Sequence, residues 1–347
     1  PSWGSEHYEG AAEGAASSEQ GRFLLPVPPG RYRVIVDRGC EYGVASELIT
    51  VEAGRTTHVR AEIERVVPTP GFVSADLHLH AAPSPDAPQS LEERVRSLVA
   101  AGVEVAVATD HNRVTDYGPA IERLGMRSEL FALIGDEVTT YRAPFGHFNV
   151  FPLLPGSAPL DYEFTGPTRL FAQARERAPF FGRTFLQVNH PRMGDIGYFD
   201  VLRLDQRDPR ALMEPRPELF AFDGIEVYNG DDASRLGEVE SVMEDWFALL
   251  RAGKRTVATG NSDSHRLTFH EPGLPRTFIA APDGDLGSLD QGELVSSLRA
   301  GKAMVSGGPF IALSIDGVGP GGEVPPGERQ VRVTVDAPPW MDVAEAE

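Results

Sequence analysis

The chain has 347 residues, with 32 lysines and arginines against 51 aspartates and glutamates, which gives a formal net charge of −19. Hydrophobic residues make up 41% and charged residues 24%, so a disordered, collagen-like or disulfide-scaffold chain is excluded. The acidic balance predicts no nucleic-acid partner, because phosphate backbones require a basic surface, and the single cysteine, Cys40, excludes an intrachain disulfide.

The first 67 residues differ in composition from the rest of the chain. Residues 1–20 are rich in Gly, Ala, Ser and Glu without periodicity, which predicts a flexible lead-in. Residues 21–67 contain short apolar runs near residues 23–25, 32–36, 46–51 and 58–63, separated by Gly and Pro turns, which predict a small antiparallel β domain. The stretch LLPVPPGRYRVIV resembles the prealbumin-like β-sandwich modules of many extracellular hydrolases.

No apolar run approaches the ~18 residues of a membrane span, so we expect none. Because the chain begins on Pro1, we expect a start segment to precede it. Together with the flanking β regions, this favours a periplasmic or secreted protein over a cytoplasmic one.

Strands alternate with amphipathic helices across residues 71–310. Strands are predicted at residues 72–77, 104–109, 131–134, 148–151, 184–188, 224–228, 255–259 and 303–306. Helices are predicted from Ser90, which forms a capping box with Glu93, and at residues 168–176, 233–252 and 289–300. Repeated βα units imply a parallel sheet, and a span of about 240 residues suits a closed or distorted barrel.

After Phe310 the chain returns to β-type patterns. Residues 311–315 and 330–335 are predicted strands within a short C-terminal β segment, residues 311–347. Two strands alone do not make a stable sheet. We therefore expect this segment to dock on the N-terminal β domain, or the natural chain to continue past Glu347.

Residue types that bind metals stand at the carboxyl ends of nearly all predicted barrel strands. His78 and His80 close the first strand at an i, i+2 spacing, so both side chains point the same way and can share one metal ion. Asp263 and His265 repeat this spacing in TGNSDSH. The other candidates follow or precede the intervening strands: Asp86, His111, Glu137, His147 and His190. A cluster of His, Asp and Glu at the loop end of a barrel is what a multinuclear metal site requires.

The motif series DLHLH, TDH, E, GH, NHP and SDSH resembles the PHP (polymerase and histidinol phosphatase) metallohydrolases in order and spacing. The resemblance covers residues 72–310. It implies an α/β fold with a distorted (β/α)7 TIM-like barrel of the PHP type, flanked by the two β parts. The stretches GHFNVFP, GIEVYNG, TGNSDSH and SGGPF resemble more specifically the CehA/McbA-type subgroup, which includes aryl-carbamate and aromatic-amide hydrolases.

The resemblance implies two to three divalent metal ions, Zn, Mn or Fe, and it implies ligands for each. The first ion would take His78, His80, Glu137 and Asp263. Glu137 would bridge to a second ion held by His147 and His190, and a third ion would take Asp86, His111 and His265. Many relatives carry a histidine at the position of Asp86. The expected catalytic residues are His78, His80, Glu137, Asp263 and His265.

Such a centre predicts hydrolysis. Water that bridges two divalent ions loses a proton near neutral pH and can attack a carbonyl or phosphorus, so no Ser or Cys nucleophile is required. We therefore expect a hydrolase of a small phosphoester, or of a carbamate or amide bond, with a small-molecule substrate that is anionic or aromatic. Ser262 and Ser264 are expected to be structural, and Asp110 and Asn189 to orient their neighbours.

Three arginines near the predicted ligands favour an anionic substrate. Guanidinium groups pair with phosphate or carboxylate oxygens in a bidentate way, which favours phosphoester cleavage. Arg142, Arg192 and Arg266 are therefore predicted to bind substrate, together with Tyr228 as an aromatic wall. Phe145 and Phe148 can line the same pocket, although buried core is the commoner place for such residues.

Two alternatives stay open. An amidohydrolase-type barrel also begins with His-x-His, but it commonly bridges its metals with a carboxylated lysine after a middle strand, and neither Lys254 nor Lys302 falls there. The second alternative is a non-catalytic, metal-stabilised surface binding module, although the candidate ligands outnumber those of a closed structural zinc site. No pattern in the sequence indicates an oligomeric state.

Overall fold

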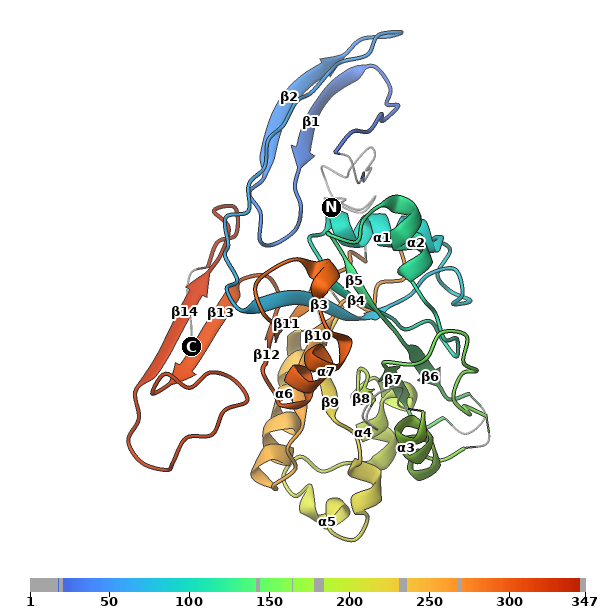
Figure 1. Cartoon of the computed structure of the whole chain (residues 1–347), viewed down its shortest axis with the longest axis vertical. Helices are drawn as coiled ribbons and strands as arrows, with labels where there is room; N and C mark the ends of the chain where they lie inside the picture. Colours follow the sequence, from blue (N-terminus) through green and yellow to red (C-terminus); the bar gives the residue numbers. More distant parts are fainter. Residues whose placement is uncertain are drawn as a thin grey trace.

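The computed structural model describes residue 18 and residues 21–141, 144–163, 165–177, 184–230, 236–267 and 270–343, which fold into a mixed α/β protein (Figure 1). These residues form two sheets of five strands and two sheets of two strands. Apart from Ser18, the predicted lead-in of residues 1–20 lies outside the described residues. None of the seven α-helices in the described ranges combines the length and the apolar character that a membrane crossing needs.

The first five-stranded sheet contains the first predicted barrel strand. Its strand order is β12 (Ala303–Ser306), β11 (Arg276–Ala280), β3 (Phe72–Leu79), β4 (Val105–Ala108) and β5 (Phe131–Ile134). β3, β4 and β5 run parallel, whereas β11 is antiparallel to both β3 and β12. Alternate residues of β4 enter two different cores, because successive side chains of a strand point to opposite faces. Ala106 packs with helices α1 (Leu91–Ala100) and α2 (Gly118–Leu124), and Val105 packs with α7 (Gln291–Arg299).

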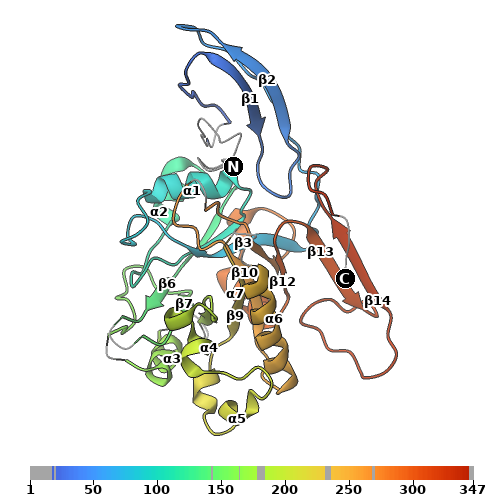
Figure 2. The same cartoon turned by 180° about the vertical axis from the view of Figure 1, so that it is seen from behind.

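The second five-stranded sheet has the order β10 (Val257–Asn261), β9 (Gly224–Asn229), β8 (Phe185–Val188), β7 (His147–Phe151) and β6 (Asp136–Thr139). β8, β9 and β10 are parallel, and β6, β7 and β8 are antiparallel. Four helices accompany this half: α3 (Pro167–Glu176), α4 (Tyr198–Leu202), α5 (Arg210–Met213) and α6 (Leu236–Arg251). Figure 2 shows α6 lying along the outside of β9, and its Val242 and Leu249 enter the same core as Ile225 of β9.

The two sheets share a core without forming a closed barrel. Val107 and Leu133 of the first sheet lie in one apolar cluster with Phe151 and Phe185 of the second. Isolated bridges, including one between Leu79 and Ser264, connect the ends of the sheets. The α/β class is as predicted, but the described residues do not confirm a distorted (β/α)7 barrel.

The prediction of a parallel sheet is confirmed for β3–β5 and for β8–β10, and two local features explain the antiparallel pairs of β6 and β7. Gly135 separates β5, the strand predicted at residues 131–134, which pairs with β4, from β6, which was not predicted and pairs with β7. A side chain at Gly135 would lie 2.8 Å from the carbonyl oxygen of Ala108, so glycine permits this passage between sheets. The connection of residues 140–146 from β6 to β7 is too short for the helical crossover that parallel strands need.

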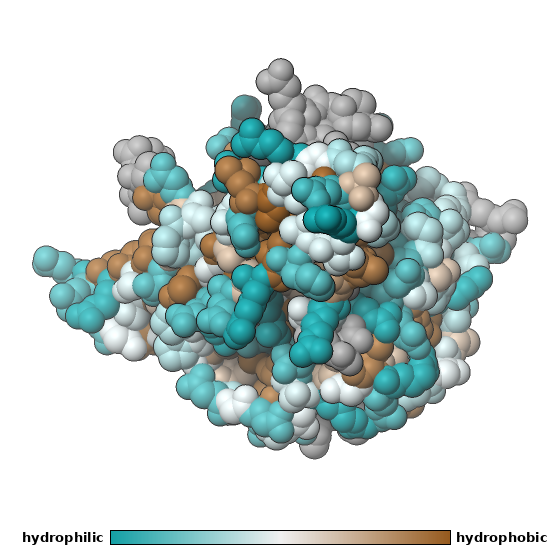
Figure 3. All heavy atoms as spheres, turned by 90° about the horizontal axis from the view of Figure 1, so that it is seen from above, coloured by the Kyte–Doolittle hydropathy of each residue, from teal (hydrophilic) through white to brown (hydrophobic). Residues whose placement is uncertain are grey.

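The two flanking β parts are hairpins. β1 (Gly30–Val36) pairs with β2 (Ala45–Val51), and β13 (Phe310–Ile315) pairs with β14 (Val331–Asp336). The strands predicted near residues 23–25 and 58–63 are absent from the described structure. Figure 1 shows the β1–β2 hairpin projecting from the sheets. Seen from above, the surface carries hydrophilic side chains mixed with smaller hydrophobic patches (Figure 3).

The C-terminal segment contacts the N-terminal part, in agreement with the expectation that it docks there. The Trp340 indole nitrogen donates a 2.8 Å hydrogen bond to the carbonyl oxygen of Tyr42, and Phe310 packs against Val67. The domain limits at residues 20, 67 and 310 stay predictions.

A buried ion pair joins the N-terminal part to the first sheet. Glu41 and Arg276 of β11 are each 2% exposed, and their Oε1 and Nη1 atoms lie 3.0 Å apart. Arg276 also donates to the carbonyl oxygens of Gly273 and Ala101. Arg65 donates to the second carboxylate oxygen of Glu41. One carboxylate thus balances two guanidinium groups at this junction.

We predict that Glu41→Ala lowers the free energy of unfolding by about 3 kcal/mol, because it leaves the buried Arg276 cation without its counter-ion. Urea denaturation of the metal-free protein measures this. The matched control is Glu323→Ala, which breaks a pair with Arg255 whose side chains are 86% and 73% exposed and should cost about 0–1 kcal/mol. Equal losses in the two variants would contradict the prediction.

Candidate metal centre

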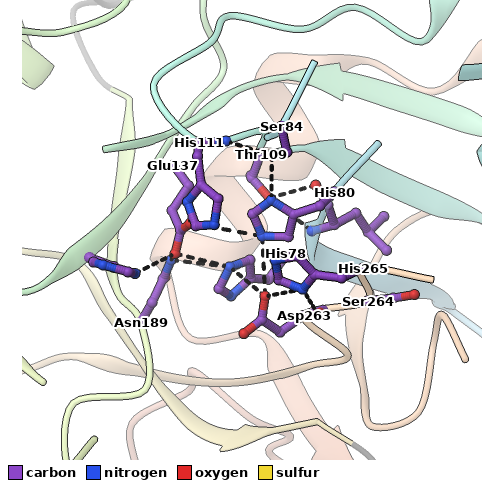
Figure 4. Close-up of polar contacts among 12 residues, drawn as sticks. His78, His80, Ser84, Thr109, His111, Glu137, Asn189, Asp263, Ser264 and His265 are labelled. Carbon is purple, nitrogen blue, oxygen red and sulfur yellow. Dashed lines mark hydrogen bonds and ion pairs between the residues drawn. The ribbon is translucent and has the colours of Figure 1, made fainter. Parts of the chain in front are cut away.

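All nine metal ligands predicted from the sequence lie in one cluster near the carboxyl ends of β3, β4, β8 and β10, and Figure 4 labels six of them: His78, His80, His111, Glu137, Asp263 and His265. Each has a side-chain nitrogen or oxygen within 3.7 Å of one from another member. The alternation of β3 directs His78 and His80 into the cluster, while Leu79 between them packs into the core beneath α1 and α2. The strand therefore fixes both rings from behind.

Glu137 of β6 lies at the centre of the cluster and is fully buried. One carboxylate oxygen, Oε1, lies 3.1 Å from Nε2 of His78, 3.3 Å from Nδ1 of His147 and 3.7 Å from Nε2 of His190. The other, Oε2, contacts Nδ1 of His111 and lies 3.8 Å from Nε2 of His80. The two oxygens therefore face different sets of imidazoles, which is the arrangement of a bridging ligand.

Asp263 forms the opposite wall of the cluster, as Figure 4 shows. Its Oδ1 lies 3.2 Å from Nε2 of His78 and 3.1 Å from Nε2 of His80. The backbone of Asp263 has a φ of +52°, a left-handed conformation that non-glycine residues rarely adopt. Such a conformation persists where the surroundings hold it, and it is common at functional sites.

Asp86 marks the open side of the cluster. Its carboxylate is 50% exposed, and Oδ2 lies 3.2 Å from Nε2 of His111 and 3.5 Å from Nε2 of His265. The rings of His265 and His80 stack with their centroids 4.0 Å apart. Since His78, His80 and Glu137 are fully buried, a substrate from solvent would meet the Asp86 side first.

Three subsets place their ligand atoms within 4.8 Å of one another: His78, His80 and Asp263; His111, Glu137 and His147; and His80, Asp86, His111 and His265. These subsets overlap with the three ligand sets that the family resemblance implies. The second set differs: His111 lies with Glu137 and His147, whereas the resemblance implies His190 at this place. The individual ligand roles stay predictions.

The cluster fits divalent cations. The buried atoms Nε2 of His80, Nδ1 of His147 and Oδ1 of Asp263 have no well-oriented hydrogen-bond partner, although buried polar atoms nearly always have one. All three face other ligand-type atoms. Imidazole and carboxylate donors together suit Zn, Mn or Fe.

The charges of the cluster also suit metal binding. Burial alone would lower the pKa of His78, but the surrounding carboxylates, led by Asp263, outweigh it and raise this pKa well above its usual value. Burial would raise the pKa of Glu137, but the imidazoles, led by His111, hold this pKa well below its usual value. Burial lowers the pKa of His80 to about 3. Glu137 is thus ionised and His80 is neutral, as metal ligands must be, whereas His78 must release a proton when it binds an ion.

Glu226 of β9 is a functional residue that the sequence analysis missed. It is buried, and its Oε1 accepts from Nδ1 of His78 at 2.9 Å and from Nδ2 of Asn261 at 2.8 Å. Its Oε2 accepts from the backbone N–H of His190 and from Nδ2 of Asn229. A carboxylate behind a ligating histidine fixes its tautomer and ring orientation. The available signal was a glutamate inside the buried strand GIEVYN.

The residues expected to orient neighbours do so. Asn189 donates to Oε1 of Glu137 at 2.9 Å, and Asp110 accepts from the backbone N–H of Ala81 at 2.6 Å. Ser262 donates to the buried carboxylate of Asp76 at 2.6 Å. Phe145 and Phe148 both lie in the apolar core.

The four predicted substrate-binding residues are not brought together in the structure as described. Arg142 lies outside the described residues. Arg192 donates from its three side-chain nitrogens to Asp245, Asp200 and the carbonyl oxygen of Leu204, so these groups already occupy its guanidinium. Arg266 is exposed beside His265, and Tyr228 lies against Gly307. The substrate roles of all four stay predictions.

No protein-family model and no curated protein matches the sequence. Among solved structures, the chain is similar to a two-domain protein from Bacteroides vulgatus that contains a predicted PHP-like metal-dependent phosphoesterase, with 20% identity and a TM-score of 0.47 over 74% of this chain and 69% of that chain. It is similar to endonuclease Q from Pyrococcus furiosus, with 11% identity and a TM-score of 0.42 over 67% of this chain and 57% of that chain. It is also similar to an amidohydrolase from Chromobacterium violaceum, with 16% identity and a TM-score of 0.38 over 66% and 97%.

These descriptions agree with the PHP resemblance of the sequence, and the CehA/McbA-type subgroup stays a prediction. Because all three TM-scores lie below 0.5, the proposals below depend on the residues of this chain alone.

The expectation of no nucleic-acid partner is corrected by the same comparisons. The chain is also similar to a further structure of endonuclease Q, in complex with a 27-mer duplex substrate that has an abasic lesion at the active site. Net charge is a property of the whole surface, whereas phosphate binding depends on the local field of a site, which bound cations can reverse. The value of −19 therefore does not exclude nucleic acid.

We predict that Glu226→Gln weakens metal binding by about 10–100-fold, the usual effect of losing a partner behind a ligand. The two carboxylate oxygens of Glu226 accept from four donors, and an amide would turn an NH₂ group toward two of them. Competition with a chromophoric chelator measures the affinity. Glu240→Gln, on the exposed face of α6, is the matched control, and an unchanged affinity in both variants would contradict the prediction.

Proposed function

We propose that the protein is a metal-dependent hydrolase of the PHP type that cleaves phosphoester bonds. The observation that carries this proposal is the position of Glu137, a fully buried carboxylate whose two oxygens face different histidines. A single structural ion would need four ligands and no bridging group. A bridging carboxylate among nine ligand-type residues supports a centre of two to three ions, which favours catalysis over a structural role.

The nine clustered residues would hold the ions, with His78 oriented by Glu226 and Glu137 oriented by Asn189. When bound, divalent ions supply Lewis-acid polarisation of the scissile ester and lower the pKa of an attacking water. The protein keeps the inner ligands dry, since His78, His80 and Glu137 are fully buried. The half-exposed Asp86 would lie on the side from which the ester approaches.

The charge of a loaded centre favours an anionic substrate. Three divalent ions against the carboxylates of Asp86, Glu137 and Asp263 would leave a local charge of about +3. The exposed guanidinium of Arg266 beside His265 would add to this field. A phosphoester is attracted to such a site, whereas an uncharged carbamate gains nothing from the long-range field.

Carbamate or amide hydrolysis is the second candidate. Three of the four stretches that resemble the CehA/McbA-type subgroup supply residues at or near the centre, namely His147, Glu226 and Asp263. The amidohydrolase alternative is less well supported. Lys254 donates to the carbonyl oxygen of Phe222, and Glu137 would serve as the bridging group in place of a lysine.

Metal content is the first test. We predict that protein reconstituted with Zn or Mn holds about two to three equivalents by elemental analysis. His78→Ala should lose at least one equivalent, because His78 contacts both carboxylates of the inner centre. His58→Ala, an exposed histidine in the N-terminal part, should leave the metal content unchanged. Less than one equivalent in the unaltered protein, with no activity gained on adding metal, would refute the proposal.

The reaction is tested with a screen of aryl phosphates, phosphodiesters, nucleotides, carbamates and anilides. We predict metal-dependent release of phosphate or alcohol from a phosphoester. Glu137→Gln should reduce kcat/KM by about 10²–10³-fold, the scale on which one charge-stabilising group acts. Hydrolysis of carbamates or anilides, without hydrolysis of any phosphoester, would favour the second candidate. If Glu137→Gln were as active as the unaltered protein, Glu137 would have no part in the reaction.

A further inference from the structure

Arg94 of α1 is a fully buried cation that the proposed reaction does not use. It stands beside Val95 and Leu98 on the buried side of the helix, where the amphipathic pattern calls for an apolar side chain. Among the described residues, no carboxylate lies within ion-pair distance of its guanidinium, and Asp76 and Asp110 interact with it only at longer range. Burying such a group without a counter-ion costs several kcal/mol. A residue that breaks the local pattern at this cost points to a role in a nearby site.

All three side-chain nitrogens of Arg94 donate to two segments that carry metal ligands. Nε donates to the carbonyl oxygen of His80 at 2.8 Å. Nη1 donates to the Ser264 hydroxyl at 2.9 Å, and Nη2 donates to the Ser264 carbonyl oxygen at 2.9 Å. One rigid planar group thus spans the end of β3 and the segment that follows β10.

These two segments define a large part of the cluster. His80 belongs to the first, while Asp263 and His265 flank Ser264 in the second. Nε2 of His80 lies 3.1 Å from Oδ1 of Asp263, and the rings of His80 and His265 stack at 4.0 Å. Asp263 also has the left-handed backbone described above, so its position depends on how firmly Ser264 is held.

We propose that Arg94 is a positioning residue of the metal centre, which fixes the separation between His80 and the pair Asp263 and His265. The fork geometry of a guanidinium suits this role, since it holds several acceptors in one plane. The proposal rests on the metal centre of the proposed function and is independent of which bond that centre cleaves.

A purely structural role is a weaker explanation, because each of these three acceptors has a second partner, and the Ser97 hydroxyl, which accepts from Nη1 at 3.4 Å, also donates to the carbonyl oxygen of Arg94. The His80 carbonyl oxygen also accepts from Nε2 of Gln89 at 2.7 Å, and the Ser264 carbonyl oxygen accepts from the His80 N–H at 3.1 Å. The Ser264 hydroxyl makes a further hydrogen bond to the carbonyl oxygen of Arg266. Replacing Arg94 by an apolar side chain of similar volume therefore leaves no acceptor without a partner. Such replacements of buried ions are often neutral or stabilising.

The experiment compares the full chain with Arg94→Met, Arg94→Lys and the control Arg123→Met, which removes an exposed arginine of α2 that pairs with Glu92. Each protein is loaded with Co²⁺, and the visible absorption spectrum and the Co²⁺ affinity are measured by competition with a chromophoric chelator. Thermal unfolding of the metal-free proteins reports on the fold. These readouts need no substrate.

We expect Arg94→Met to unfold at the temperature of the unaltered protein, to bind Co²⁺ about tenfold or more weakly, and to change the spectrum. Arg94→Lys should also bind more weakly, since one ammonium cannot reach the His80 oxygen and both Ser264 oxygens together. Arg123→Met should match the unaltered protein in all three measurements.

Unaltered spectra and affinities in a folded Arg94→Met protein would overturn the proposal. Should Arg94→Met fail to fold, unaltered spectra and affinities in Arg94→Lys would overturn it equally. Failure of the proposed function looks different. In that case the unaltered protein binds Co²⁺, the Arg94 variants still bind it more weakly, and no phosphoester, carbamate or amide is hydrolysed.

Discussion

The concentration of charge around Glu137 is the constraint on which the rest of the structure depends. Five imidazoles and a second carboxylate, Asp263, surround it in a buried volume. An arrangement of this kind is stable only when opposite charges alternate and each group keeps a hydrogen bond. The strand ends of both sheets must therefore converge on one point. The passage of the chain through Gly135, which carries Glu137 from the first sheet into the second, makes this convergence possible.

Around the cluster lies a second layer of polar groups that holds the ligands from behind. Glu226, Asn189 and Arg94 each contact a different part of it, through a ring nitrogen, a carboxylate oxygen and two backbone segments respectively. Groups of this kind pre-organise a site, because they remove the rotamer freedom of the ligands before anything binds. The burial of Glu226, Asn189 and Arg94 is thus explained by the site and not by the apolar core.

The sequence predicts well which residues meet in the cluster, because their signal is local. The alternation of His78 and His80 along a buried strand, and its repeat at Asp263 and His265, requires only neighbouring residues to read. The pairing direction of strands is not local, and for this reason β11 and the antiparallel pairs of β6 and β7 were missed. Glu226 was missed because one acidic residue in a strand carries no spacing signal. Arg192 pairs with Asp200 and Asp245. These pairs cannot be predicted from the sequence, because they form only when α6 packs against the loop after β8.

The two large sheets are connected at their ends by isolated bridges, yet they supply ligands to the same cluster. Ions bound there would act as cross-links between segments as far apart in the chain as His78 and His265. An unfolded chain cannot assemble such a site, so the free energy of ion binding is added to the free energy of folding. Metal supply would then determine how much folded protein persists. A cell short of the metal would lose the protein itself to unfolding and proteolysis.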